Sequence, residues 1–264
     1  MRYVIDHDYH IHSTLSSCCK DPEQTPEAIL RYGETNGLKE ICLTNHVWDD
    51  TVAPAGPWYQ PQNIPHIRSI LPLPQSEKVR FHFGCEADID QNLILGLSDE
   101  AAAEMDFINV AVSHLHIESN VPKSTPLEQR AVIYVQRMNV ALNSSLPDGK
   151  VGFAHPTTPL IANAAPDGHL RVLDMIPDSV MIHLFTRAAE RRFGVELNFD
   201  ATRYTPEQQK SAYRLYHIAK ECGCKFYLGS DAHSLKALDA AMEKFDRMID
   251  ALGLTEDDKF KPFA

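Results

Sequence analysis

The segment Asp8-Tyr-His10-Ile-His12-Ser13 follows a short apolar run and places two histidines one residue apart. Side chains on an extended strand alternate between its two faces, so His10 and His12 should point the same way. Two imidazoles on one face, flanked by a carboxylate, can hold a single cation. Alone this is a weak signal, because His-x-His also occurs on ordinary protein surfaces.

Similar polar clusters recur along the chain, and nearly every one comes directly after a short apolar run. They are Thr44-Asn45-His46, Gly84-Cys85-Glu86, Ser113-His114-Leu115-His116, Ala154-His155-Pro156 and Ser230-Asp231-Ala232-His233. A histidine seen singly is more often an ordinary core or surface residue than a ligand. Joint occurrence at consecutive strand ends reverses that expectation. We infer that these segments are strand ends that converge on one metal centre.

Strands and helices are predicted to alternate along the chain. Apolar runs predict seven strands, at residues 3–9, 40–44, 79–84, 107–112, 150–154, 194–198 and 225–229. Two helix starts are marked by a threonine N-cap followed by proline, at Thr25-Pro26 and at Thr205-Pro206. Other helices are expected over 127–144, 177–192 and 235–252. The proline-rich stretch 47–74, with a short helix at 64–71, is expected to overhang the site.

This alternation implies parallel strands joined by right-handed crossovers. Seven such units without a Gly-rich dinucleotide turn favour a closed or nearly closed barrel over an open doubly wound sheet. In such barrels the carboxyl ends of the strands share one face, where active sites lie. Residues 1–264 are expected to form one domain, because no compositional break indicates a linker.

The composition disfavours several classes of partner, although it does not exclude a local cationic pocket. Lys and Arg total 25 against 36 for Asp and Glu, giving a formal charge of −11, which argues against nucleic-acid or membrane-surface binding. No apolar run approaches the roughly 20 residues that span a bilayer, and the N-terminus lacks a signal-peptide core. Six cysteines form no spaced disulfide framework, so reduced thiols and a cytoplasmic location are expected.

Imidazole and carboxylate ligands suit Zn²⁺, Mn²⁺ and Fe²⁺. The candidate ligands are His10, His12, His46, Glu86, His114, His155, Asp231 and His233. Eight ligands are too many for one tetrahedral ion and suit two or three divalent ions, with Glu86 able to bridge. Two cations about 3.5–4 Å apart would hold a hydroxide nucleophile and clamp a phosphoryl group. Neutral histidines add no charge, so two or three divalent cations would outweigh the negative charges of Glu86 and Asp231. The remaining positive charge would complement a phosphate ester dianion.

These motifs, in this order, resemble those of the PHP superfamily, named for polymerase and histidinol phosphatase. The resemblance spans essentially the whole chain and implies a distorted (β/α)7 TIM-like barrel with a trinuclear phosphoesterase site. It implies that one metal is held by His10, His12, Glu86 and Asp231. The second would be held by Glu86, His114 and His155, and the third in part by His46 and His233. Asp231 and His233 are predicted to act in catalysis through a metal-bound hydroxide.

The chain departs from the family at one position. The family often has a further histidine six residues after the second histidine of the first motif, and here that residue is Cys18. A thiolate could ligate the third ion, or that ion could be weak or absent.

Three further residues are predicted to contact substrate. Asn198 ends a predicted strand and should face the site, and Arg203 lies just beyond it as a phosphate clamp, although it could also be an ordinary loop charge. His116 shares a face with His114 if that strand continues, which allows a substrate-facing role.

The favoured function is hydrolysis of a small phosphomonoester, with histidinol phosphate suggested first by the resemblance. The alternative is a nuclease or phosphodiesterase, which the acidic balance disfavours. An amidohydrolase would commonly carry a bridging lysine at a strand end, and none is found here. A catalytically silent relative is disfavoured by the near-complete ligand set.

Overall fold

The computed structural model describes residues 1–164 and 166–263, and its strands form two parallel sheets. The first sheet contains β1 (His7–Ile11), β2 (Glu40–Leu43) and β4 (Arg80–Phe83), in that order. The second has the order β3 (His46–Val47), β5 (Cys85–Ala87), β6 (Ile108–Val110), β7 (Val151–Phe153), β8 (Gly194–Leu197) and β9 (Lys225–Leu228). The chain is therefore a mixed α/β protein with parallel sheets, as the sequence predicted.

The two sheets are joined through a pair of interrupted strands. β2 continues into β3 after two residues, and β4 continues into β5 after Gly84. Hydrogen bonds cross the interruption from Gly84 N to Leu43 O at 2.9 Å and from Glu86 N to Asn45 O at 3.0 Å. Each split strand thus corresponds to one predicted strand, and all seven predicted strands are confirmed. The first begins at His7, four residues later than predicted.

The first and last strands also meet. The backbone N–H of Asp231 donates to His10 O at 2.7 Å, and that of His12 donates to Ala232 O at 3.1 Å. Between these segments there is an isolated bridge, Ile11 with Ala232, and no ladder joins β1 to β9 in the described part of the chain. Closure of the expected barrel is therefore not seen in the strand pairing.

Two helices begin where the sequence places a threonine cap. α1 (Pro26–Thr35) is capped by Thr25, and α7 (Pro206–Glu221) by Thr205 in a complete capping box with Gln208. The other predicted helices are α2 (Ile64–Arg68), α4 (Leu127–Asn143), α6 (Asp178–Glu190) and α8 (Leu235–Leu252). Two short helices were not predicted, α3 (Asp99–Glu104) and α5 (Gly168–Asp174). Both are shorter than two full turns, so neither shows a helical period of apolar residues.

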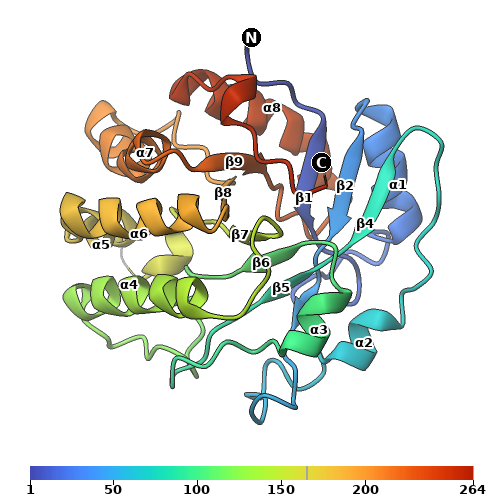
Figure 1. Ribbon diagram of the computed structural model, residues 1–264, viewed down its shortest axis with the longest axis horizontal. Coiled ribbons are helices and arrows are strands. Elements are labelled where there is room, and N and C mark those ends of the chain that lie inside the picture. Colours follow the sequence, from blue (N-terminus) through green and yellow to red (C-terminus); the bar gives the residue numbers. More distant parts are fainter. Residues whose placement is uncertain (165, 264) are drawn as a thin grey trace.

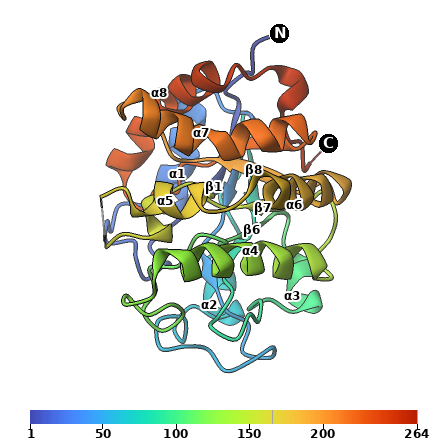
Figure 2. The ribbon, with the colours of Figure 1, turned by 90° about the vertical axis from the view of Figure 1, so that its left-hand side faces the viewer.

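The helices cover the outer faces of the strands. Figure 1 shows α4, α5, α6 and α7 along the side formed by β6 to β9, with α8 above β1 and β9 and α1 beside β2. Seen from that side, α4, α6 and α7 lie in successive tiers (Figure 2). Most buried apolar side chains form one large cluster that includes Met138, Phe185 and Phe245, each fully shielded from solvent, and a smaller cluster surrounds Phe107. Among the described residues, every helix is too short or too polar to span a lipid bilayer.

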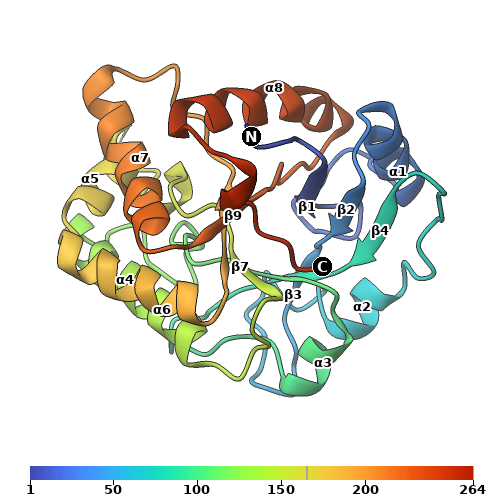
Figure 3. The same cartoon turned by 45° about the horizontal axis from the view of Figure 1, so that its top comes forward.

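The carboxyl-terminal segment crosses the opposite end of the strands from the polar clusters. The backbone N–H of Phe260 donates to Phe226 O at 2.8 Å. Phe263 stacks on His82, with ring centroids 3.6 Å apart. Figure 3 shows this end of the chain lying close to β1 and β2. The predicted metal ligands therefore lie at the carboxyl ends of the strands, while the carboxyl-terminal segment covers the opposite end.

Candidate metal centre

Eight polar side chains gather at the carboxyl ends of the strands, although they are spread over more than two hundred residues of sequence. His10 lies in β1 with His12 just after it, His46 opens β3, and Glu86 lies in β5; His114, His155, Asp231 and His233 follow β6, β7 and β9. Parallel strands present their carboxyl ends at one edge, which explains how distant residues meet. The predicted ligand candidates are thus brought together, apart from Cys18, which lies at the rim.

Glu86 lies at the centre of this cluster and is fully buried. Its Oε1 is 2.7 Å from Nε2 of His155 and 3.5 Å from Nε2 of His114. Its Oε2 is 2.8 Å from Nδ1 of His46, 3.3 Å from Nε2 of His12 and 3.4 Å from Nε2 of His10. One carboxylate therefore faces five imidazoles, with a different group at each oxygen, which is the arrangement that a bridging ligand requires.

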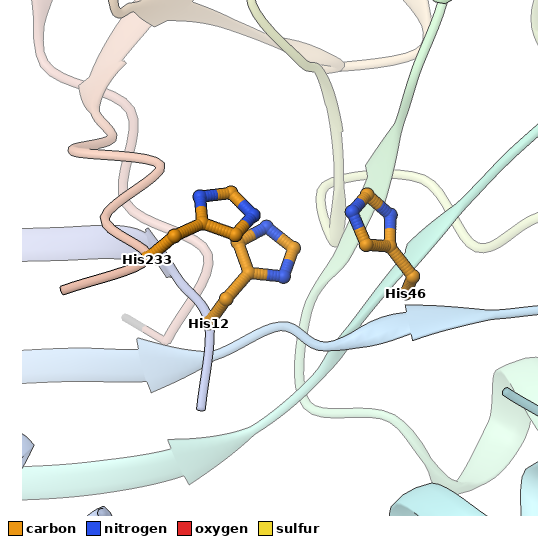
Figure 4. A group of neighbouring side chains, drawn as sticks. All are labelled: His12, His46 and His233. Carbon is orange, nitrogen blue, oxygen red and sulfur yellow. The ribbon is translucent and has the colours of Figure 1, made fainter. Parts of the chain in front are cut away.

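Asp231 supplies the second carboxylate. Its Oδ1 lies 3.1 Å from Nε2 of His12 and 3.6 Å from Nε2 of His10. His10, His12, Glu86 and Asp231 offer ligand atoms within 4.8 Å of one another, as do His46, Glu86 and His114. Figure 4 shows a third such group, in which His12 and His233 stack with ring centroids 4.2 Å apart and His46 lies beside them.

The outer ring nitrogens are held by protein groups, which fixes the direction of the inner ones. Nδ1 of His10 donates to Glu196 at 2.7 Å, and Nδ1 of His114 donates to Asp88 at 2.9 Å. Because an ionised carboxylate only accepts hydrogen bonds, both rings carry their proton on Nδ1 and present an Nε2 lone pair inward. Nδ1 of His12 bonds Ser16 Oγ at 2.8 Å, and that of His155 bonds Ser113 Oγ.

The electrostatics of the cluster favour positive charge at its centre. Burial opposes ionisation of Glu86, but His46, His10 and His114 outweigh it and lower its pKa well below the usual range. The pKa of Asp231 is likewise lowered by His10 and His12 in spite of burial. Burial also opposes a charge on His10, yet Glu196, Glu86 and Asp231 raise its pKa. Two ionised carboxylates in a buried site need positive charge beside them, which protonated imidazoles or a bound cation can supply.

Orphaned atoms test whether a cation fits. Nδ1 of His46, Oε2 of Glu86 and Nε2 of His233 are buried and have no hydrogen-bond partner among the described residues. Nδ1 of His46 and Oε2 of Glu86 are 2.8 Å apart without hydrogen-bond geometry. Unsatisfied buried polar atoms are rare in proteins and call for an explanation such as an ion. Nitrogen and carboxylate donors in this mixture fit Zn²⁺, Mn²⁺ or Fe²⁺.

The backbone is strained at two of these positions. His155 has φ of 32° and Asp231 has φ of 53°, in a region that residues with a side chain seldom adopt. Such outliers cluster at functional sites. Close packing also requires a glycine here, because a Cβ atom on Gly229 would lie 1.8 Å from Oε1 of Glu196. That glycine lets Glu196 reach His10.

A cavity of about 190 Å³ opens onto the cluster. Its walls include Cys18, His116, Trp58, Ile117 and Leu160, together with His46, His114, Asp231 and His233. Trp58 comes from the proline-rich stretch and meets His46 edge-on, with ring centroids 4.9 Å apart. The stretch therefore reaches the mouth of the site, as expected. Burial, with a smaller effect of His114, lowers the pKa of His116 to about 4.

Two residues predicted to contact substrate, Asn198 and Arg203, do not line this cavity. The side-chain amide of Asn198 donates to Gly229 O at 3.0 Å, so it ties the end of β8 to the end of β9. Arg203 is exposed on the loop before α7 and is not among the described residues that line the mouth. Strand alternation places Asn198 on the same face of β8 as Glu196, but its side-chain N–H donates to a backbone carbonyl.

Sequence reasoning missed the carboxylates that orient the imidazoles. Glu196 lies two residues before Asn198 on the same strand face, and it is a lone acid in an apolar run. Asp88 lies two residues after Glu86, again on the same face, and also accepts from Arg137 and Tyr59. In both cases strand alternation could have revealed the acid, because residues two apart on a strand point to the same face.

No protein-family model matches the chain, and no curated protein matches it either. Among solved structures, one match is a histidinol phosphate phosphatase from Lactococcus lactis, in complex with zinc, L-histidinol and phosphate. It has a TM-score of 0.63 and 17% identity, and the match covers 97% of this chain and 98% of that one. The chain has the fold of this phosphatase. A Listeria monocytogenes protein assigned as a histidinol phosphatase also matches, with a TM-score of 0.60, 12% identity, and coverage of 90% and 99%.

Proposed function

We propose that the chain is a metal-dependent phosphomonoesterase that acts on a small substrate. The observation that carries this proposal is the cluster itself, in which Glu86 and Asp231 lie among six imidazoles with inward-facing nitrogens. The likeness of fold to a phosphatase solved with zinc, histidinol and phosphate supports it. Divalent cations bound here would neutralise the phosphoryl oxygens and lower the pKa of a water nucleophile.

The residues of the chain would hold two or three such ions. His10, His12, Glu86 and Asp231 supply one set of ligand atoms, and His46, Glu86 and His114 supply another. His155, whose Nε2 lies 2.7 Å from Oε1 of Glu86, completes the second set. His12, His46 and His233 form the third group, to which Cys18 at the rim is a candidate addition. Asp231 and His233, which the sequence assigned to catalysis, would act through the ions they hold.

The mouth of the site indicates the size and character of the organic half. Trp58, Ile117 and Leu160 give it apolar walls, and the neutral imidazole of His116 adds a polar contact. No lysine or arginine lines this mouth among the described residues, which suits a small monoester better than a polyanionic strand. Histidinol phosphate is the first substrate to test, because its size and its imidazole suit such walls.

The test is hydrolysis of p-nitrophenyl phosphate and histidinol phosphate by the purified chain, before and after chelation and after return of Zn²⁺, Mn²⁺ or Fe²⁺. Elemental analysis of the same sample counts the ions. We expect activity that is lost with chelator, restored by metal, and reduced at least about a thousandfold in His12→Gln. The matched control is His217→Gln, which changes an exposed histidine on α7. Absence of metal-dependent activity on every monoester would refute the proposal.

The alternative nuclease activity is examined in the same assay. A labelled single strand and bis-p-nitrophenyl phosphate serve as phosphodiester substrates. Metal-dependent cleavage of these diesters, without cleavage of a monoester, would reassign the site.

We further propose that residues 1–264 form one domain and that the two sheets are parts of a distorted (β/α)7 barrel. The hydrogen bonds that join the sheets, and those between β1 and the segment after β9, support this. A cytoplasmic location is also proposed, and the free state of all six cysteines supports it.

A further inference from the structure

A second cavity lies at the opposite end of the strands from the metal centre. It has a volume of about 420 Å³ and is formed where β7, β8 and β9 begin. Lys150 precedes β7, Arg192 and Phe193 precede β8, and Lys225 opens β9. The carboxyl-terminal segment 260–262 forms the remaining wall. The volume lies within the range of small-molecule sites, and none of these residues belongs to the metal centre.

The walls of this cavity are strongly cationic, although the chain carries a formal charge of −11. Four cations line it, namely Lys150, Arg192, Lys225 and Lys261. None of the four forms an ion pair with a carboxylate in the described part of the chain; Lys225 donates to the backbone oxygen of Asp257 at 2.7 Å. The one acid on the wall, Asp148, is paired with Arg191 at 2.9 Å.

A neighbouring cavity shows that unpaired cations are not general at this end of the molecule. That cavity has a volume of about 270 Å³ and is also lined by lysines and an arginine. There, Lys259 pairs with Asp6 at 3.0 Å, and Arg80 pairs with Glu40 at 3.1 Å. Apart from Lys261, which lines both cavities, the cations of this smaller cavity are paired with carboxylates of the described chain, whereas those of the 420 Å³ cavity are not.

The backbone at Arg192 gives an independent indication. Arg192 lies at the end of α6 in the left-handed region, with φ of 52°. At the corresponding ends of α1, α7 and α8 the chain has glycine, at Gly37, Gly223 and Gly253, with φ of 67°, 86° and 55°. Glycine is the residue that this conformation favours. An arginine at this position is therefore best explained by an interaction that its guanidinium makes. The guanidinium lies over Gly149, on the wall of the cavity.

We propose that this cavity binds a phosphate dianion, either free or carried by a small molecule. Arginine binds phosphate oxygens in a bidentate manner, and flexible lysines add point charges around it. Phe260 and Pro262 would lie against an organic portion. A ligand held between Arg192, Lys150 and Lys261 would tie the carboxyl-terminal segment to the starts of β7 and β8. Binding should therefore raise the thermal stability of the protein.

The test separates this cavity from the metal centre, which would also attract phosphate. Thermal unfolding is followed during titration with sodium phosphate in a Glu86→Gln background, against sodium chloride of equal ionic strength. If that variant does not purify in folded form, wild-type protein treated with chelator replaces it. Arg192→Gly and Lys261→Gln are compared with Lys210→Gln, which removes an exposed lysine on α7 away from the cavity.

We expect phosphate to raise the midpoint of unfolding in the background and in Lys210→Gln. Arg192→Gly should weaken the apparent affinity at least about tenfold, as loss of one charged contact would do, and Lys261→Gln should weaken it in the same direction. Without phosphate, Arg192→Gly should be at least as stable as its parent, because glycine suits the backbone there. No phosphate-dependent shift, or equal shifts in all variants, would overturn the proposal. Phenyl phosphate titrated in parallel distinguishes the two sources: tighter binding than phosphate indicates a phosphorylated small molecule, and equal binding indicates free phosphate.

Discussion

The carboxylate of Glu196 lies 2.7 Å from Nδ1 of His10, and both side chains are fully buried. Its other oxygen accepts a hydrogen bond from the backbone N–H of His155. One acid on β8 therefore orients two residues of the candidate metal centre, on β1 and after β7. Partners of this kind set the tautomer and the basicity of a ligand imidazole.

We predict that Glu196→Gln lowers the affinity for metal by about 10- to 100-fold. Glutamine has a single acceptor oxygen and cannot serve both His10 and the N–H of His155. The measurement is competition with a chelating dye, and far-ultraviolet circular dichroism checks the fold. Glu207→Gln, in the exposed first turn of α7, is the matched control. Unchanged affinity in Glu196→Gln would show that this acid does not position a ligand.

A second prediction concerns the fully buried ion pair between Asp88 and Arg137. Asp88 also accepts from Nδ1 of His114 at 2.9 Å. Asp88→Asn would leave the guanidinium of Arg137 buried without its counter-charge, so we expect a loss of about 3–5 kcal/mol in the free energy of unfolding. Urea unfolding measures it. Asp246→Asn, which breaks an exposed pair with Arg2, should change stability by about 0–1 kcal/mol. Similar effects of the two substitutions would contradict this reasoning.

Cys18 lines the mouth beside His46 and His233, where the third group of histidines lies. We predict that Cys18→Ala weakens only the third cation and leaves the two around Glu86 in place, because those two have other ligands. Metal content after dialysis at increasing chelator concentration gives the measurement. Cys222→Ala, a half-buried cysteine at the end of α7, serves as control. Loss of all the metal from Cys18→Ala would place this thiol at the centre instead.

The pH dependence of stability should include a contribution from His169. This side chain is fully shielded, and neither of its ring nitrogens has a partner in the described structure. Burial lowers its pKa below the ordinary value near 6.5. As pH falls through 6.5 the unfolded chain binds the proton first, so the folded state loses stability until the folded pKa is reached.

His169→Leu should remove this part of the acid sensitivity, which amounts to at most about 1.4 kcal/mol per pH unit for one group. Urea unfolding at pH 7 and pH 5.5 measures the difference. His217→Leu, which removes an exposed imidazole, provides the comparison. An equal loss of stability in wild type and His169→Leu would show that His169 does not titrate on unfolding.

Much of the fold was readable because its signals are local. Capping residues marked α1 and α7, and short apolar runs marked seven strands. The helices α3 and α5 were missed because they are too short to show a period. The split of two strands at Thr44–Asn45 and at Gly84 was also missed, since it results from how neighbouring strands pair.

For the candidate site, the sequence by itself determined which side chains are candidate ligands and that they lie at strand ends, because side-chain chemistry and strand alternation are properties of a few consecutive residues. Only the tertiary structure decided which buried groups form hydrogen bonds to these side chains and orient them. Glu196 and His10 are 186 residues apart, and nothing in the local sequence of either specifies the other. The same holds for Asn198, whose side-chain amide donates to a carbonyl oxygen 31 residues away. Which partner a buried polar group meets is set by the packing of whole strands against one another, and that packing is decided by the entire chain.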